Sequence, residues 1–356
     1  MPEGALAPTV GALAVRPDLD APALSSLPPA PLARIRELSE RFWREAGAVD
    51  AAQVVPASHL NALAEAGLYG VCAPADEGGL GLGYGQVCAV VEELAAGCVA
   101  STFLWAQHLR LLGAVLSRET PAPWREQVRD EVISGRRKGG VVLTGLMPGP
   151  VRLAAQPEGH GWRLRGEAPW VSGWGIVDRL FVVARGPDST TVEFDMEARE
   201  HPGLSVAPAR LSALNATSTV SLRFDGVAMG AEQVLGVRPY EEARQASEGL
   251  RLNGSFALGV AERCCRLLGP SQLDSELLAR REQLDTASTE DMPAARAAAC
   301  ELAVRAAHAV AVSRGSRAAL AGDVAERSTR EASVLLVFGS RPAIKSELLR
   351  RLHADG

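Results

Sequence analysis

The sequence has little that would bind nucleic acid or enter a membrane. Its formal net charge is −5 and it contains no block of Lys or Arg, so the electrostatic basis for binding a phosphate backbone is missing. Lys138 and Lys345 are the only lysines, while arginine is abundant, which we attribute to nucleotide bias. No apolar run reaches 18 residues and no cationic segment precedes an apolar one at the N-terminus. We therefore expect a cytoplasmic protein without a membrane segment.

Metal-binding and common catalytic motifs are also missing. The six cysteines show no metal-ligand spacing, and the adjacent Cys264 and Cys265 would face different sides of a helix. This pattern favours buried, reduced thiols over zinc ligands or a disulfide, so we predict no metal. A P-loop, a Gly-x-Ser-x-Gly elbow and a His-Glu-x-x-His motif are all lacking.

The chain is long enough for two or three domains, since 356 residues with 47% apolar content can bury large cores. The Ala- and Pro-rich residues 1–30 predict a flexible tail. Residues 31–138 and 237–356 have helical periodicity, and residues 139–236 between them have strand periodicity. In the last part we expect four helices, at about 240–268, 271–287, 293–321 and 323–352.

The middle domain is predicted to be an antiparallel sheet or barrel. Between 141 and 185, apolar and polar residues alternate, and three pairs, Gly159/Gly161, Gly166/Glu167 and Gly173/Gly175, are expected to be turns. A second group of strands follows Pro202, with Asp225-Gly226 as a turn between strands 219–224 and 227–229.

Several segments together resemble the acyl-CoA dehydrogenase superfamily. They are LAEAGLYGVCAPADEGGLGLG (63–83), VVEEL (90–94), CVASTFLWAQHLRLL (98–112), GWRLRGEAPWVSG (161–173), VD (177–178), VVAR (182–185), TSTVSLRFDGV (217–227) and VLG (234–236). The resemblance covers roughly residues 31–265. It implies an α+β fold of that family, with an N-terminal helical domain, a central antiparallel β domain and a C-terminal four-helix bundle.

The resemblance implies a flavoprotein, a flavin-dependent oxidoreductase that desaturates the α,β-bond of an acyl-CoA thioester. FAD, or else FMN or a reduced flavin, would lie between the β domain and the C-terminal helices. The matching flavin-binding positions are Val142 and Thr144 on one strand, and Trp170, Val171 and Ser172 on another. The sequence departs from the family at 145–152, GLMPGPVR, where the Ser that binds the flavin pyrophosphate is missing.

The catalytic base of the family is not found at its usual place, because the C-terminal Tyr-Glu-Gly-Thr segment is absent. Glu248, next to the alternative position on the first C-terminal helix, is a weak candidate base. Glu262, several turns further along, is expected to be a surface or interface charge.

Two alternatives to desaturation remain. His108 resembles a His that flavin monooxygenases of the same fold carry near the reactive carbon, and neutral imidazole could exchange a proton near pH 7 there. Alternatively, the chain is a catalytically degenerate partner subunit. The helices 294–311 and 333–352 would then form an interface, in a homo-oligomer or in a hetero-oligomer with a related subunit. An electron-transfer flavoprotein is the partner that the family implies.

Overall fold

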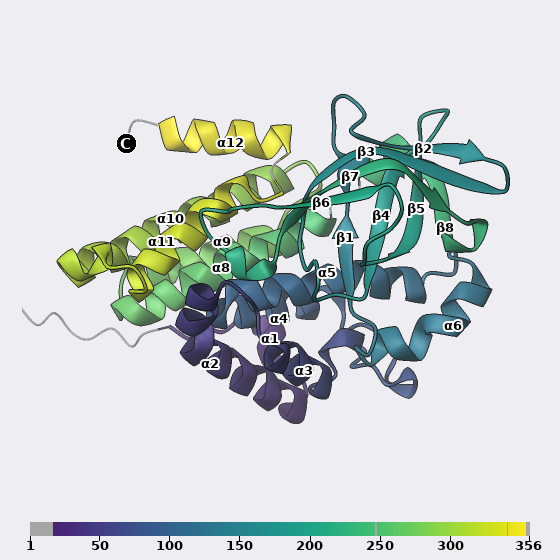
Figure 1. The fold of residues 1–356 in the computed structure, drawn as a ribbon. Coiled ribbons are helices and arrows are strands. Elements are labelled where there is room, and N and C mark those ends of the chain that lie inside the picture. Colours follow the sequence, from purple (N-terminus) through teal and green to yellow (C-terminus); the bar gives the residue numbers. More distant parts are fainter. Residues whose placement is uncertain (1–16, 246–247, 340, 354–356) are drawn as a thin grey trace, which may run out of the picture.

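The computed structural model describes residues 17–245, 248–339 and 341–353, without the side chains of 248–250. Figure 1 shows three parts in chain order: a helical layer in purple and blue, a teal sheet beside it, and a green and yellow helical bundle. This confirms the predicted order of helices, strands and helices.

The N-terminal part is helical. Its helices are α1 (Pro22–Ser25), α2 (Pro29–Ala52), α3 (Ala57–Glu65), α4 (Tyr84–Gly97), α5 (Val99–Leu116) and α6 (Ala122–Ile133), with 3-10 turns η1 (Leu68–Gly70) and η2 (Ala75–Glu77). α5 is long and apolar enough to cross a membrane, but 56% of it is buried inside the fold, as expected of a core helix. The prediction of a flexible tail is wrong for residues 17–30, since Leu19, Leu24 and Leu27 are at most 5% exposed.

The middle part is one mixed sheet. Its strands are β1 (Gly139–Val142), β2 (Leu153–Glu158), β3 (Gly161–Val171), β4 (Arg179–Arg185), β5 (Thr190–Glu197), β6 (Leu204–Pro208), β7 (Val220–Met229) and β8 (Val234–Pro239), with 3-10 turns η3 (Thr144–Leu146), η4 (Asn215–Thr217) and η5 (Ala231–Gln233). The order is β6-β7-β3-β2-β4-β5-β8, and β1 pairs with β4. Most pairs are antiparallel, but β4 runs parallel to β1 and β2.

Two expected turns are wrong, because the glycines lie inside long strands. Gly166 is in β3 with φ +127°, and a Cβ there would lie 2.0 Å from the carbonyl oxygen of Arg152. Gly226 is in β7, whose register against β3 shifts at this level. Gly226 therefore allows a bulge, and Gly166 allows a positive φ and the close approach of the Arg152 carbonyl, neither being a chain reversal.

The C-terminal part consists of α7 (Tyr240–Gln245), α8 (Glu248–Leu268), α9 (Gln272–Thr286), α10 (Met292–Arg314), the 3-10 helix η6 (Gly315–Ala319), α11 (Val324–Val337) and α12 (Pro342–His353). The single helix expected at 323–352 is wrong: Gly339 has φ +60° and Pro342 begins α12, the usual residues at a helix end and a helix start. The helix expected at 293–321 changes to 3-10 geometry after Arg314.

The two helical parts share one hydrophobic core. α8 packs so closely on α4 that a Cβ at Gly259 would lie 2.4 Å from the carbonyl oxygen of Glu92. α10 lies inside the bundle, and the side chains of Ala295, Leu302 and Ala306 are buried within this chain. Much of the apolar surface predicted to form an interface at 294–311 is therefore internal. A separate core lies in the sheet.

Candidate functional site

The end of β3 presents an unusual tryptophan. Trp170 is 70% exposed although it lies in a strand, and its φ is +65°, in the left-handed region. The register between β3 and β7 shifts between Ala168 and Val171, so a bulge sets this conformation. Val171, the next residue, is 1% exposed and packs in the sheet core. Only the indole of this pair is available to a ligand.

Ser172 is 5% exposed, and its hydroxyl belongs to a buried chain of hydrogen bonds. The Ser172 and Thr219 hydroxyls are 2.7 Å apart, Thr219 and Thr217 are also 2.7 Å apart, and Thr217 donates to the Leu214 carbonyl at 2.8 Å. The carbonyl can only accept, so the chain satisfies all three contacts when each hydroxyl donates toward Leu214. The Ser172 proton is then used inside the protein.

β1 brings the second predicted segment beside the first. A Cβ at Gly140 would lie 3.2 Å from the Ser172 carbonyl oxygen, so β1 passes close to the end of β3. Val142 is 1% exposed and faces the sheet core, whereas Thr144, the first residue of η3, is half-buried. The structure records no hydrogen bond to the Thr144 side chain within its described residues. Thr144 and Trp170 are therefore the two predicted side chains that remain unused.

The loop after η3 is held down by one arginine. Arg185, the last residue of β4, donates from Nε to the Gly145 carbonyl and from an Nη to the Met147 carbonyl, both at 3.3 Å. The Tyr240 ring lies against its guanidinium, 3.4 Å from Cζ to the ring centre. The Tyr240 hydroxyl also donates to the Met147 carbonyl, at 3.4 Å. The segment that departs from the family pattern is thus ordered by contacts of its own.

His108 does not lie in an open site. It is fully buried in α5; its Nδ1 accepts from the Gly139 amide at 3.0 Å and its Nε2 donates to the Val132 carbonyl at 3.1 Å. Burial lowers the pKa of His108 to about 3. The imidazole therefore stays neutral with both nitrogens engaged, which contradicts the expectation that it could exchange a proton near pH 7.

Glu248 is the first residue of α8, but its side chain lies outside the part of the chain that the structure describes. Three residues later, Arg251 is 6% exposed and donates to Asp285 at 2.6 and 2.8 Å, and to Ser255 at 2.9 Å. The role of Glu248 as base stays a prediction.

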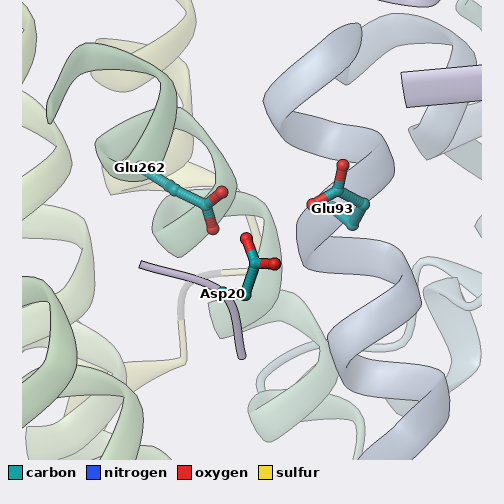
Figure 2. A group of neighbouring side chains, drawn as sticks. All are labelled: Asp20, Glu93 and Glu262. Carbon is teal, nitrogen blue, oxygen red and sulfur yellow. The ribbon is translucent and has the colours of Figure 1, made fainter. Parts of the chain in front are cut away.

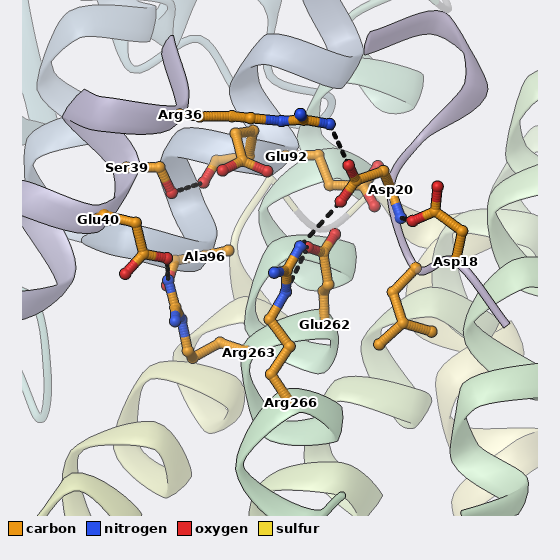
Figure 3. A network of polar contacts seen from close by, with 12 residues as sticks. Asp18, Asp20, Arg36, Ser39, Glu40, Glu92, Ala96, Glu262, Arg263 and Arg266 are labelled. Atoms are coloured by element: carbon orange, nitrogen blue, oxygen red, sulfur yellow. Dashed lines mark hydrogen bonds and ion pairs between the residues drawn. The ribbon is translucent and has the colours of Figure 1, made fainter. Parts of the chain in front are cut away.

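Sequence analysis missed a buried network of ion pairs between α4, α8 and α9. Glu262, expected at the surface, is 2% exposed, and Arg281 lies between it and Glu92. Arg266 lies between Glu262 and Asp20 (Figure 3). Its guanidinium is 2.7 Å from a Glu262 oxygen and 3.0 Å from an Asp20 oxygen. Burial, with Glu92 and Glu93 nearby, raises the pKa of Glu262 to about 8.

Carboxylate oxygens of Asp20, Glu93 and Glu262 lie within 4.8 Å of one another (Figure 2). Arg266 binds two of these three side chains, so a guanidinium already supplies positive charge there. We interpret the group as part of the ion-pair network. The sequence shows these charged residues only at helical spacing, and helical spacing does not reveal whether a charged side chain is buried.

A groove of about 520 Å³ lies elsewhere, beside the start of β4. Its charged lining includes Arg136, Asp178, Arg179 and Glu197, and it contains none of the predicted site residues. Trp170 and Thr144 are the better candidates for a ligand site. The Trp170 indole is exposed, the Thr144 hydroxyl has no hydrogen bond in the described part of the chain, and the sequence predicted both residues to bind the flavin.

Comparison with known proteins bears on the family and the fold of the chain. Residues 32–136 match the family model "Acyl-CoA dehydrogenase, N-terminal domain". A 3-sulfinopropanoyl-CoA desulfinase of Paraburkholderia xenovorans is 25% identical over 272 residues, which are 70% of this chain and 68% of the relative. Other curated relatives are matched over 31–57% of their own length.

The fold agrees along nearly the whole chain. A glutaryl-coenzyme A dehydrogenase in complex with glutaryl-CoA has a TM-score of 0.76 at 19% identity, covering 92% of this chain and 96% of that one. A dibenzothiophene monooxygenase from Paenibacillus sp. A11-2 has a TM-score of 0.72 at 17% identity, covering 91% and 97%. Residues 32–136 therefore match the N-terminal domain of the acyl-CoA dehydrogenase family, and the whole chain has the fold of these enzymes. The chain has the three expected parts, with an exposed Trp170 at the end of β3.

Proposed function

We propose that this chain is a flavin-dependent oxidoreductase that desaturates an acyl-CoA thioester, with the flavin ring against Trp170. The observation that carries the proposal is the exposed indole beside the unused Thr144 hydroxyl, in a member of a superfamily of flavoproteins. A flat apolar surface with one hydroxyl at its side suits an aromatic ring with polar edges.

The residues present fit FAD in part. Trp170 can stack on the ring and Thr144 can hydrogen-bond to its edge. Val142 and Val171 point into the sheet core, so their contribution would be through the backbone. The Ser172 hydroxyl, whose proton is used by Thr219, is left as an acceptor. When bound, FAD would supply the two-electron acceptor, and the protein supplies position and hydrogen bonds.

Desaturation also requires a carboxylate that removes the α-proton, and we propose Glu248 for this role. Glu248 is the first residue of α8, in the C-terminal helical part, and lies next to the alternative position of the base that the resemblance implies. The neighbouring Arg251 is bound to Asp285. A desolvated carboxylate there would have the raised pKa that a general base needs.

Two other functions share this fold. A flavin monooxygenase is represented among structures with the same fold, but the buried, neutral His108 gives that reaction no proton donor at the predicted position. A catalytically degenerate partner subunit would bind no flavin. We keep a homo- or hetero-oligomer, an electron-transfer flavoprotein as electron acceptor and a cytoplasmic location as proposals.

The test is an anaerobic screen of the purified, flavin-loaded protein with acyl-CoA thioesters. Bleaching of the flavin absorbance by one thioester supports desaturation. Bleaching by none, followed by a peroxyflavin absorbance when chemically reduced protein meets oxygen, supports the monooxygenase. Colourless protein that takes up neither FAD nor FMN supports the non-catalytic subunit and contradicts the proposal.

A further inference from the structure

Most arginines of the β domain are already paired with carboxylates. Residues 139–236 contain eight arginines. Five form ion pairs with acidic side chains: Arg163, Arg165, Arg179, Arg199 and Arg223. The other three, Arg152, Arg185 and Arg210, have no carboxylate partner within the residues that the structure describes.

Two of these three unpaired arginines lie on neighbouring strands. Ala154 of β2 pairs with Arg185 of β4, and Arg152 precedes Ala154 by two residues. Arg152 is exposed and the structure records no contact of its side chain, while Arg185 is half-buried. Arg152 is the last residue of the loop 145–152, and Arg185 binds the Gly145 and Met147 carbonyls at the start of that loop. Two guanidinium groups without a carboxylate partner in the described part of the chain therefore lie at this loop, which follows Thr144.

Arg185 is also held in a fixed orientation. The Tyr240 ring packs on its face, and two of its five N–H donors bind the Gly145 and Met147 carbonyls. Three donors remain. A planar guanidinium whose orientation is set by stacking and whose free donors lie along one edge suits the oxygens of a phosphate.

We propose that Arg152 and Arg185 bind the phosphate group of the flavin side chain. This inference rests on the proposed flavin site. Ala154 of β2 pairs with Arg185 on one side and with Arg165 of β3 on the other, so Arg165 and Arg185 lie at the same height in the sheet. Trp170 follows Arg165 by five residues, which is about 17 Å along an extended strand. The bulge before Trp170 shortens that path, and the ribityl chain together with two long arginine side chains spans it.

FMN and riboflavin differ only in the phosphate, so their affinities test the inference. We expect FMN to bind the wild-type protein more tightly than riboflavin does. Arg152→Gln should weaken FMN roughly tenfold or more, the usual value of a charged hydrogen bond, and leave riboflavin unchanged. Arg185→Gln also releases the Gly145 and Met147 carbonyls, so it should weaken both ligands, and FMN by roughly tenfold more than riboflavin. Higher salt should reduce the advantage of FMN, because Arg152 is exposed. The affinity for FAD should change in the variants as the affinity for FMN does.

The matched control is Arg165→Gln, which removes the same charge from the same level of the sheet but at a guanidinium already paired with Asp225. It should leave both affinities within about twofold. Arg152→Gln guards against misfolding as a cause, since its side chain has no contact to lose. Equal binding of FMN and riboflavin to the wild type, or equal losses for both ligands in the variants, would refute the phosphate site alone. If neither flavin binds the wild type, the proposed function fails and this inference fails with it.

Discussion

The buried ion pairs predict a sharp difference between two substitutions of one network. Arg281 donates to Glu92 Oε1 at 2.5 and 2.9 Å, to the Leu19 carbonyl at 2.9 Å and to Glu262 at 3.3 Å. Arg281→Met removes the guanidinium and leaves the buried Glu92 without its cation. Removing one partner of a buried pair costs about 3–5 kcal/mol.

Glu262→Gln should behave differently. Burial and the neighbouring carboxylates raise the pKa of Glu262 to about 8, against the opposing effect of Arg266 and Arg281, so we predict that the side chain is mostly protonated at pH 7. A glutamine has nearly the same shape and charge as a protonated glutamate. We expect a loss below about 1 kcal/mol, because one neutral hydrogen-bonding group replaces another.

The assay is thermal unfolding at pH 7. Since about 1 kcal/mol corresponds to roughly 2–4 °C in a domain of this size class, Arg281→Met should lower Tm by roughly 10 °C and Glu262→Gln by no more than about 3 °C. Equal losses in the two variants would show that Glu262 is ionised in the folded protein and would refute the reasoning.

The same network predicts how stability depends on pH. Between the unfolded pKa of Glu262, near 4.5, and its folded pKa, near 8, the folded state holds one more proton than the unfolded state. Stability from this group therefore falls as pH rises through that window. Glu262→Gln should flatten this part of the profile, and an unchanged slope in the variant would contradict the assignment.

Three substitutions test the proposed site. Trp170→Ala should weaken flavin binding yet change the free energy of unfolding by less than about 0.5 kcal/mol, because the indole is 70% exposed; calorimetric titration and thermal unfolding separate the two effects. His108→Phe should lose about 2–4 kcal/mol, because the Gly139 amide and the Val132 carbonyl lose their partner, but leave the flavin spectrum of folded protein unchanged; a changed spectrum would return His108 to the site. Glu248→Gln should abolish anaerobic bleaching by acyl-CoA while flavin affinity stays the same, and bleaching at the wild-type rate would remove Glu248 as base.

The fold was predictable wherever a local pattern determines it. The helix expected at 271–287 is α9, 272–286, since its ends depend on nearby residues. Glycines were harder to interpret. Gly159 does lie between β2 and β3, but Gly226 allows a bulge within β7 and Gly166 allows the Arg152 carbonyl to approach β3. A positive φ serves a turn and a bulge equally, so the sequence alone does not distinguish them.

The prediction of the site was incomplete because the resemblance does not show which way each side chain points. The resemblance located the ends of β1 and β3, but strand neighbours alternate between faces, so Val142 and Val171 face the core. The burial of Glu262 could not be read from its helix either. The Glu262 carboxylate is covered by α4, more than 160 residues away along the chain, and by the segment around Leu19 and Asp20, more than 240 residues away. Helical spacing does not show which segments, distant in the sequence, pack over a side chain.

The conformation of Trp170 is difficult to explain by stability alone. An indole that is 70% exposed buries little apolar area, so its packing stabilises the fold weakly. Its φ of +65° costs about 1–3 kcal/mol for a residue other than glycine. Glycine would adopt the same backbone without that strain, and it would remove an exposed apolar ring from the surface. Because the free protein gains so little from this side chain, we infer that a bound molecule covers the indole and provides the compensating contact. The flavin of the proposed site, with its phosphate at Arg152 and Arg185, would supply such a contact.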